Sequence, residues 1–188
     1  MSTSQETQSG NGLQQDRGDS GRCLCSAVTF NVTGPPIYNV ICHCVNCKGM
    51  WFRVNRRLTL ISNYGRRQGG SMFHTASIFL KSQYTLHTGS ESITIYDDHE
   101  TQSGVSLRRG FCKVCGSKIS ALTPLNENII SVPAGILERA GLDWSPQKEQ
   151  FCSFKARWIP EFGKDLVAQR FVKGPFGEEV IEGEGELK

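Results

Sequence analysis

The chain has 188 residues, of which 38% are hydrophobic and 21% are charged, and it carries eight cysteines and a net charge of +3. This length and composition are typical of one globular domain with a hydrophobic core. No run approaches the roughly 18 apolar residues of a membrane helix, and the first twenty residues lack the apolar region of a secretory signal. We therefore expect neither a membrane span nor secretion.

We expect the protein in the cytoplasm, or in the nucleus, where thiols stay reduced. There, clustered cysteines serve as metal ligands or catalytic groups more often than as disulfides. The positive charge is concentrated in residues 49–68, which hold five arginines and no acid, so the rest of the chain has a net charge of −2. This distribution argues against a nucleic-acid partner. The sequence predicts no particular oligomeric state.

In chain order, the pattern predicts a mainly β protein. Residues 1–20 are polar and predict a disordered tail. Strands are indicated wherever apolar and polar residues alternate, whereas helix signals are weak and amount to a single turn at 136–140. The expected strands cover 28–32, 38–41, 78–80, 84–88, 92–96, 105–111, 119–122, 129–132 and the aromatic stretch 151–158.

The irregular, arginine-rich residues 49–68 are predicted to be an insertion, and the glutamates near the C-terminus predict a solvated acidic tail. We accordingly divide the chain into the tail 1–20, a domain at 21–160 that contains the insertion, and a C-terminal extension at 161–188.

Seven of the eight cysteines form three tight clusters: Cys23 and Cys25; Cys42, Cys44 and Cys47; Cys112 and Cys115. The last pair precedes Gly116 in a C-x-x-C-G knuckle, where the glycine lets the backbone turn so that both sulfurs converge on one ion. Because two ligands do not close a tetrahedral zinc site, we assign the first pair to the same ion, assuming that both of its side chains share one face of a strand. This predicts one closed four-cysteine site whose metal binding is coupled to folding.

Cys42, Cys44 and Cys47 then form a second zinc site with one position open, the arrangement typical of catalytic sites. Three thiolates give the ion a net charge of −1, so it should acidify water weakly and accept a thiol as its fourth ligand. A substrate thiol bound there is a nucleophile for a carbonyl compound. The alternative is a pair of structural zincs without chemistry.

The remaining candidate ligands are less well placed. If Cys42 and Cys44 share one face, His43 points away from the metal and makes an outer-shell hydrogen bond or packs in the core. His74, His87 and His99 have no recognisable ligand spacing and are expected at the surface or in turns. Cys152 is expected to be a small buried hydrophobe, although it is the spare thiol that could close the open site.

These motifs resemble, from about residue 21 to residue 158, the glutathione-dependent formaldehyde-activating enzymes and the related centromere protein V domain. The resemblance is carried by GRCLCSAVTF at 21–30, CHCVNC at 42–47, YDD at 96–98, RGFCKVCGS at 109–117, PAGIL at 133–137 and RW at 157–158. It implies a β-rich α+β domain of several small coiled antiparallel sheets organised around zinc. It also implies one zinc on Cys23, Cys25, Cys112 and Cys115, and another on Cys42, Cys44 and Cys47.

The resemblance further implies a carbon–sulfur lyase type of enzyme that adds glutathione to formaldehyde, giving S-hydroxymethylglutathione, with a small-molecule thiol as its partner. The alternative is a non-catalytic zinc-binding module for protein or chromatin contacts. Family members lack the insertion at 49–68, which here is either a lineage-specific loop or an in-frame piece of unspliced intron. Because it adjoins the reactive cysteines, it is expected to alter or block that site.

Overall fold

The structure, a computed structural model, describes residues 18–44, 46, 71–101, 103–139 and 144–174. The predicted tail up to residue 17, the predicted insertion 49–68 and the acidic tail beyond residue 174 lie outside the described residues. None of the helices in the described part of the chain is long and apolar enough to cross a membrane.

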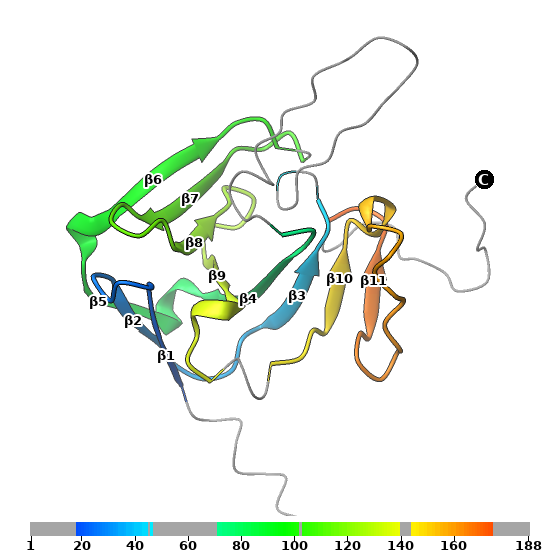
Figure 1. Cartoon of the computed structure of the whole chain (residues 1–188), viewed down its shortest axis with the longest axis horizontal. Coiled ribbons are helices and arrows are strands. Elements are labelled where there is room, and N and C mark those ends of the chain that lie inside the picture. Colours follow the sequence, from blue (N-terminus) through cyan, green and yellow to red (C-terminus); the bar gives the residue numbers. More distant parts are fainter. Residues whose placement is uncertain (1–17, 45, 47–70, 102, 140–143, 175–188) are drawn as a thin grey trace, which may run out of the picture.

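The predicted mainly β fold is confirmed: two sheets hold eleven strands of the described chain, and its helices are short 3₁₀ turns. The smaller sheet has the order β1-β2-β5 and the larger one the order β11-β10-β3-β4-β9-β8-β7-β6 (Figure 1). The strands are β1 (Asp19–Arg22), β2 (Thr29–Val32), β3 (Tyr38–Cys42), β4 (His74–Leu80), β5 (Tyr84–Thr88), β6 (Ile93–Asp98), β7 (Leu107–Cys112), β8 (Lys118–Leu122), β9 (Ile129–Pro133), β10 (Lys148–Gln150) and β11 (Gln169–Phe171). The 3₁₀ turns are η1 (Lys81–Gln83), η2 (Ser90–Ser92), η3 (Ala134–Ile136) and η4 (Cys152–Phe154).

Three predictions about single elements were wrong. The aromatic stretch 151–158 is not a strand, because Phe151 has a φ of +58° and begins the turn η4; the strand lies just before it, at β10. The helical turn expected at 136–140 lies earlier, at η3. The sheets are not wholly antiparallel either, since β10 runs parallel to both β3 and β11.

Two strands also differ from the expected domain limits. β1 begins at Asp19, inside the stretch predicted to be tail, because its backbone pairs with β2. β11 lies beyond residue 160, in the predicted extension, and completes one edge of the larger sheet.

The main core lies between the smaller sheet and one face of the larger one. Phe30 and the other apolar residues of β2 contribute from the smaller sheet, and Phe79, Ile119, Ile130 and Val132 from the larger. Cys23 and Cys112 belong to the same buried cluster. The first and last cysteine clusters therefore each contribute a residue to the core. The opposite face of the larger sheet carries a smaller apolar cluster of Val40, Ala76 and Ile78.

Gly21 tests how tightly β1 packs against the core residue Phe30 of β2, its partner strand in the smaller sheet. A Cβ at Gly21 would lie 2.2 Å from Cζ of the buried Phe30 ring, whereas a Cβ at Gly135 would meet nothing within 4 Å. Overpacking a core costs about 1–3 kcal/mol. We expect Gly21→Ala to lower the free energy of unfolding by about that amount in urea denaturation, and Gly135→Ala to change it by less than about 0.5 kcal/mol. Equal effects of the two substitutions would contradict this packing.

Candidate functional site

The first and last cysteine clusters meet at one edge of the core. The four Sγ atoms of Cys23, Cys25, Cys112 and Cys115 all lie within 4.8 Å of one another. Sγ of Cys25 is 3.5 Å from that of Cys23 and 3.7 Å from that of Cys112. Four sulfurs bound tetrahedrally at the usual zinc–sulfur distance of about 2.3 Å lie about 3.8 Å apart. The cluster therefore fits a tetrahedral metal ion, and four thiolates are the usual donors of a structural zinc.

The two pairs reach this position by different local structures. Gly116 has a φ of +74° and its N–H donates to the Cys112 carbonyl at 2.8 Å, as expected for the knuckle. Cys23 and Cys25, however, do not lie on a strand; they lie in the tight turn between β1 and β2. There Ser26 has a φ of +60° and donates its N–H to the Cys23 carbonyl. The pairing was inferred from strand geometry, whereas the turn is what brings the sulfurs together.

Neighbouring groups stabilise the thiolate form of Cys23 and Cys115. A backbone hydrogen bond from Ala27 lowers the pKa of Cys25, but burial and the three neighbouring sulfurs outweigh it and raise this pKa to about 12. The backbone N–H of Val28 donates to Sγ of Cys23 at 3.3 Å. Sγ of Cys115 is hydrogen-bonded to the Ser117 hydroxyl at 3.3 Å. Hydrogen bonds with the side chain and backbone of Ser117, together with those from Cys25, lower the pKa of Cys115 to about 5. The Ser117 hydroxyl also accepts a hydrogen bond from the N–H of Leu24, which joins the two halves of the cluster. Because metals bind thiolates, the surroundings of Cys23 and Cys115 favour metal binding at neutral pH.

Cys42 and Cys44 are both buried, at and just after the end of β3, where Phe151 packs against them. The third cysteine of this cluster, Cys47, lies outside the described residues. Cys42 stands opposite His74 on β4 and opposite Gln150 on β10. Residues directly opposite in a sheet share a face, so Cys42 and His74 point to the same side.

His43 is directed to the other side of the sheet, as alternation along the chain predicts. It is fully buried, and its Nε2 donates to Oε1 of Glu149 at 2.8 Å, since a carboxylate can only accept. Glu149 lies on β10 opposite Ile41, on the face that His43 reaches. An outer-shell hydrogen bond was one of the expectations for His43, and the structure supplies Glu149 as its acceptor.

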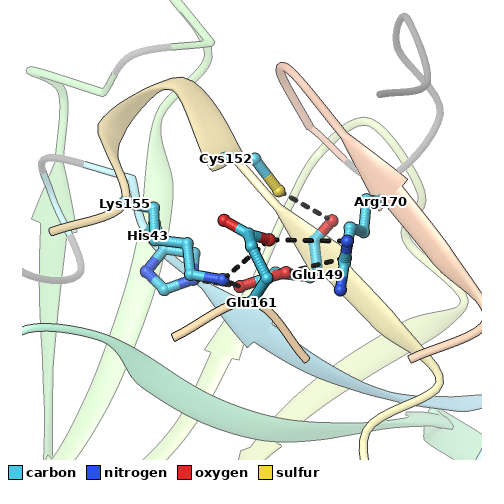
Figure 2. Close-up of polar contacts among 6 residues, drawn as sticks. All are labelled: His43, Glu149, Cys152, Lys155, Glu161 and Arg170. Carbon is cyan, nitrogen blue, oxygen red and sulfur yellow. Dashed lines mark hydrogen bonds and ion pairs between the residues drawn. The ribbon is translucent and has the colours of Figure 1, made fainter. Parts of the chain in front are cut away.

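Glu149 is the centre of a buried charge network, and Figure 2 shows the polar side chains that surround it. Its carboxylate also contacts Nζ of Lys155 at 3.0 Å and Nε of Arg170 at 3.3 Å. Both cations reach the exposed carboxylate of Glu161, at 3.3 and 3.4 Å. The network therefore ties β10, β11 and the turn after η4 to the segment that carries Cys42 and Cys44.

Cys152 contacts this network rather than the other thiols. Its Sγ lies 3.6 Å from the Glu149 carbonyl oxygen, to which it donates. Burial, followed by the charge of Glu149, raises the pKa of Cys152 to about 12. Cys152 was expected to be a buried hydrophobe in a strand; it is half-buried and begins η4.

Sequence reasoning missed Glu149, Lys155 and Arg170, which carry no local motif, because their shared contacts join segments that are distant in the chain. It also placed His74 at the surface or in a turn, whereas this residue is half-buried on β4. The face on which His74 lies could have been inferred from the alternation along β3, but only if the pairing of β3 with β4 had been known.

Comparisons with known proteins place the cysteines of this chain within one family match. The model of the family described as glutathione-dependent formaldehyde-activating enzyme matches residues 19–53 and 63–154. All seven clustered cysteines fall within the matched residues, and the unmatched residues 54–62 fall inside the predicted insertion. A crystal structure of a Rhodobacter sphaeroides protein, solved as a structural-genomics target, is 22% identical, with a TM-score of 0.39 over 63% of this chain and 87% of that one.

No curated protein sequence matches the chain. The family match nevertheless covers most of its length and includes every cysteine of the candidate site. The chain therefore belongs to the glutathione-dependent formaldehyde-activating enzyme family.

Proposed function

We propose that the protein is a carbon–sulfur lyase type of enzyme that joins glutathione, or a similar small thiol, to formaldehyde and also catalyses the reverse reaction. The observation that carries this proposal is the family match across all seven clustered cysteines. Family membership itself indicates an activity related to glutathione and formaldehyde. A reducing compartment such as the cytoplasm would keep the thiols available.

We assign the two cysteine sets different tasks. Cys23, Cys25, Cys112 and Cys115 would hold a structural zinc, which the sulfur spacing supports. Cys42, Cys44 and Cys47 would hold a second zinc, which, when bound, supplies an electrophilic centre that keeps a substrate thiol as its thiolate. Two zinc ions per chain are thus expected.

The chemistry proposed is addition of a thiol to an aldehyde. The thiolate sulfur attacks the carbonyl carbon, a carbon–sulfur bond forms, and the carbon–oxygen π electrons move to oxygen, which takes up a proton. The thiol has lost its proton before this step, so atoms and charge balance in S-hydroxymethylglutathione. The reverse reaction removes the hydroxyl proton and breaks the carbon–sulfur bond.

In this proposal the residues of the chain hold the reactive cysteines in position for the substrate thiol. Cys42 is fixed by β-pairing on both sides, to β4 and to β10, and Cys44 lies two residues further along, buried against Phe151. Glu149 holds the His43 ring on the opposite face, so the imidazole does not compete with the substrate for this side of the sheet. In this proposal the substrate thiol binds on the Cys42 side of the sheet.

Cys44→Ser tests the assignment of the second set. We expect the wild-type protein to carry two zinc ions and the variant one, with the variant folded and its acceleration of glutathione–formaldehyde exchange lost. Zinc is counted by elemental analysis, and exchange is measured by NMR against the uncatalysed reaction. Cys152→Ser, which removes a thiol outside both sets, should keep two zinc ions and the wild-type rate.

Two results would contradict the proposal in different ways. Unfolding of Cys44→Ser would give this cysteine a structural role instead of a reactive one. Wild-type protein with two zinc ions and no acceleration of exchange would favour the alternative, a non-catalytic zinc-binding module for protein or chromatin contacts.

A further inference from the structure

His43 lies between two cysteines of the proposed reactive set, and both its backbone and its ring are bound to β10. Its backbone N–H donates to the Gln150 carbonyl at 3.0 Å. Its Nε2 donates to Oε1 of Glu149, the preceding residue of β10, at 2.8 Å (Figure 2). The side chains of His43 and Glu149 are both fully buried. The strand β10 therefore holds residue 43 by main chain and side chain at once.

The rotation of the imidazole ring depends on Glu149. Nδ1 of His43 is buried and has no hydrogen-bond partner in the part of the chain that the structure describes. The Phe73 ring packs beside the imidazole, with centroids 6.1 Å apart, and offers no carboxylate or carbonyl acceptor. Among the described contacts, the hydrogen bond to Glu149 is thus the directional one, and a bond to an ionised acceptor is stronger than a neutral one.

The charges of the network do not require His43. Two carboxylates, those of Glu149 and Glu161, face two cations, Lys155 and Arg170, and the four charges sum to zero. Glu149 therefore stays paired with both cations even without the imidazole. What its hydrogen bond to His43 supplies is a fixed direction for that side chain.

The direction of the His43 side chain decides the direction of its two neighbours. Successive side chains of an extended chain point to opposite faces, so Cys42 and Cys44 point away from Glu149. The two cysteines form one buried cluster, against which Phe151 packs. Cys42 is the last residue of β3, and Cys44 lies beyond the end of that strand. The backbone at residue 43 joins the two, and a rotation there would separate their sulfurs.

The segment is anchored again just after Cys44. The side-chain amide of the buried Asn46 donates to the Glu100 carbonyl at 2.7 Å. Cys44 therefore lies between two side-chain anchors, at residues 43 and 46. Ligands that are already ordered lose less conformational entropy when a metal binds, so such anchors strengthen metal binding.

We propose that Glu149 is a positioning residue for the metal site assigned to Cys42 and Cys44, and that it acts through the ring of His43. The inference rests on the proposed function, because it concerns the second metal ion assigned there. Loss of the hydrogen bond between Glu149 and His43 should weaken metal binding and leave the donor atoms unchanged. Outer-shell contacts typically change metal affinity by about 10- to 100-fold.

The test titrates cobalt(II), whose absorption reports thiolate ligands, into the full chain after a mild chelator has removed the more weakly held ion. The absorption that Cys44→Ser lacks belongs to the site of Cys42 and Cys44. We expect His43→Leu to raise the dissociation constant of cobalt at this site about tenfold, because leucine has a similar volume and makes no hydrogen bond to Glu149. The positions of the absorption bands should not change, since the sulfur donors are the same.

Rescue by a matched pair of variants separates positioning from packing. The amide nitrogen of a glutamine can take the place of Nε2, whereas asparagine is one methylene shorter and does not reach Glu149. His43→Gln should therefore keep the dissociation constant within about threefold of the wild-type value, and His43→Asn should raise it about tenfold. This pair also carries the test if His43→Leu does not fold.

Ile130→Ala controls for a general loss of stability. It removes buried core atoms from β9, which pairs with neither β3 nor β10. It should lower the free energy of unfolding and change the cobalt dissociation constant by less than about twofold. An effect of Ile130→Ala as large as that of His43→Leu would overturn the proposal, as would equal losses in His43→Gln and His43→Asn.

Failure of this inference is distinguishable from failure of the proposed function. If the wild type accelerates glutathione–formaldehyde exchange and His43→Leu binds cobalt as tightly as the wild type, the inference fails and the proposed function stands. If cobalt binding shows the expected losses and the wild type with both ions does not accelerate exchange, the proposed function fails and the positioning role of Glu149 stands.

Discussion

Replacing Cys25 with serine is expected to destabilise the whole domain by several kcal/mol. Cys25 is exposed, and a substitution at an exposed position normally changes the free energy of unfolding by less than about 0.5 kcal/mol. Its Sγ, however, lies within 3.7 Å of the sulfurs of Cys23 and Cys112, which belong to the main core. Loss of one ligand removes the metal that joins the two halves of the core, and structural zinc contributes about 10–16 kcal/mol of binding free energy in small domains.

The measurement pairs a zinc count with thermal unfolding followed by circular dichroism. Cys25→Ser should hold one zinc ion less than the wild type and melt at a much lower temperature. Treatment of the wild type with a strong chelator should lower its melting temperature at least as far. Cys152→Ser serves as the matched control, because its thiol lies outside the cluster, and it should retain both zinc ions. Full zinc content and unchanged stability in Cys25→Ser would show that the cluster does not hold a structural metal.

The cysteine pairing could be predicted because ligand spacing is a local property. The C-x-x-C-G spacing at Cys112 and Cys115 is by itself typical of a zinc knuckle. Because a tetrahedral zinc ion needs four ligands, a second pair of cysteines must lie elsewhere in the chain. The turn that carries Cys23 and Cys25 could not be predicted with the same success. Alternation after residue 25 suggested a strand, whereas the positive φ of Ser26 depends on the hydrogen bonds that close this turn.

Strands were predicted well where one face is apolar and the other polar. The strand expected at 84–88 coincides with β5, which packs one side on the core. The strand β10 has the sequence Lys-Glu-Gln and carries no such signal, and its central residue is nevertheless fully buried. Its burial depends on cations contributed by residues 155 and 170, so no local pattern could reveal it. The aromatic residues at 151–158 gave the opposite error, because they carry a strand-like pattern and do not form a strand.

A small pocket lined by His74, Arg109, Lys118 and Ser131, among others, shows the same limit. Arg109 belongs to the sequence motif that leads into Cys112, and its position on β7 follows from alternation. Its place beside His74 depends instead on the strand order β4-β9-β8-β7, in which β4 pairs with the last of three consecutive strands, β7 to β9. Sequence alone indicates which residue types are present, whereas the pairing of strands decides which of them share a site.

The second large effect is expected at Glu149, and Glu149→Gln should lower the free energy of unfolding by about 3–5 kcal/mol at neutral pH. Glutamine has nearly the same shape but no charge, while Lys155, 8% exposed, and Arg170, 10% exposed, keep theirs. Removing one member of a buried ion pair leaves an uncompensated charge, which is the costly case. The exposed Glu161 contacts the same two cations and provides the matched control. Because its side chain is 73% exposed, Glu161→Gln should cost less than about 1 kcal/mol.

The pH dependence gives this prediction a second test. Burial acts to raise the pKa of Glu149, but hydrogen bonds from His43 and Lys155 outweigh it, so the pKa in the folded protein lies below its ordinary value. The stabilisation is then complete above the unfolded glutamate pKa of about 4.3, and it is lost as the pH falls from there through the folded value. Urea denaturation at a series of pH values should show the wild type losing stability relative to Glu149→Gln over that range. A difference between the two proteins that does not shrink at low pH, or an equal loss in Glu161→Gln, would mean that the carboxylate charge of Glu149 is not what holds β10 and β11 to the segment that carries Cys42 and Cys44.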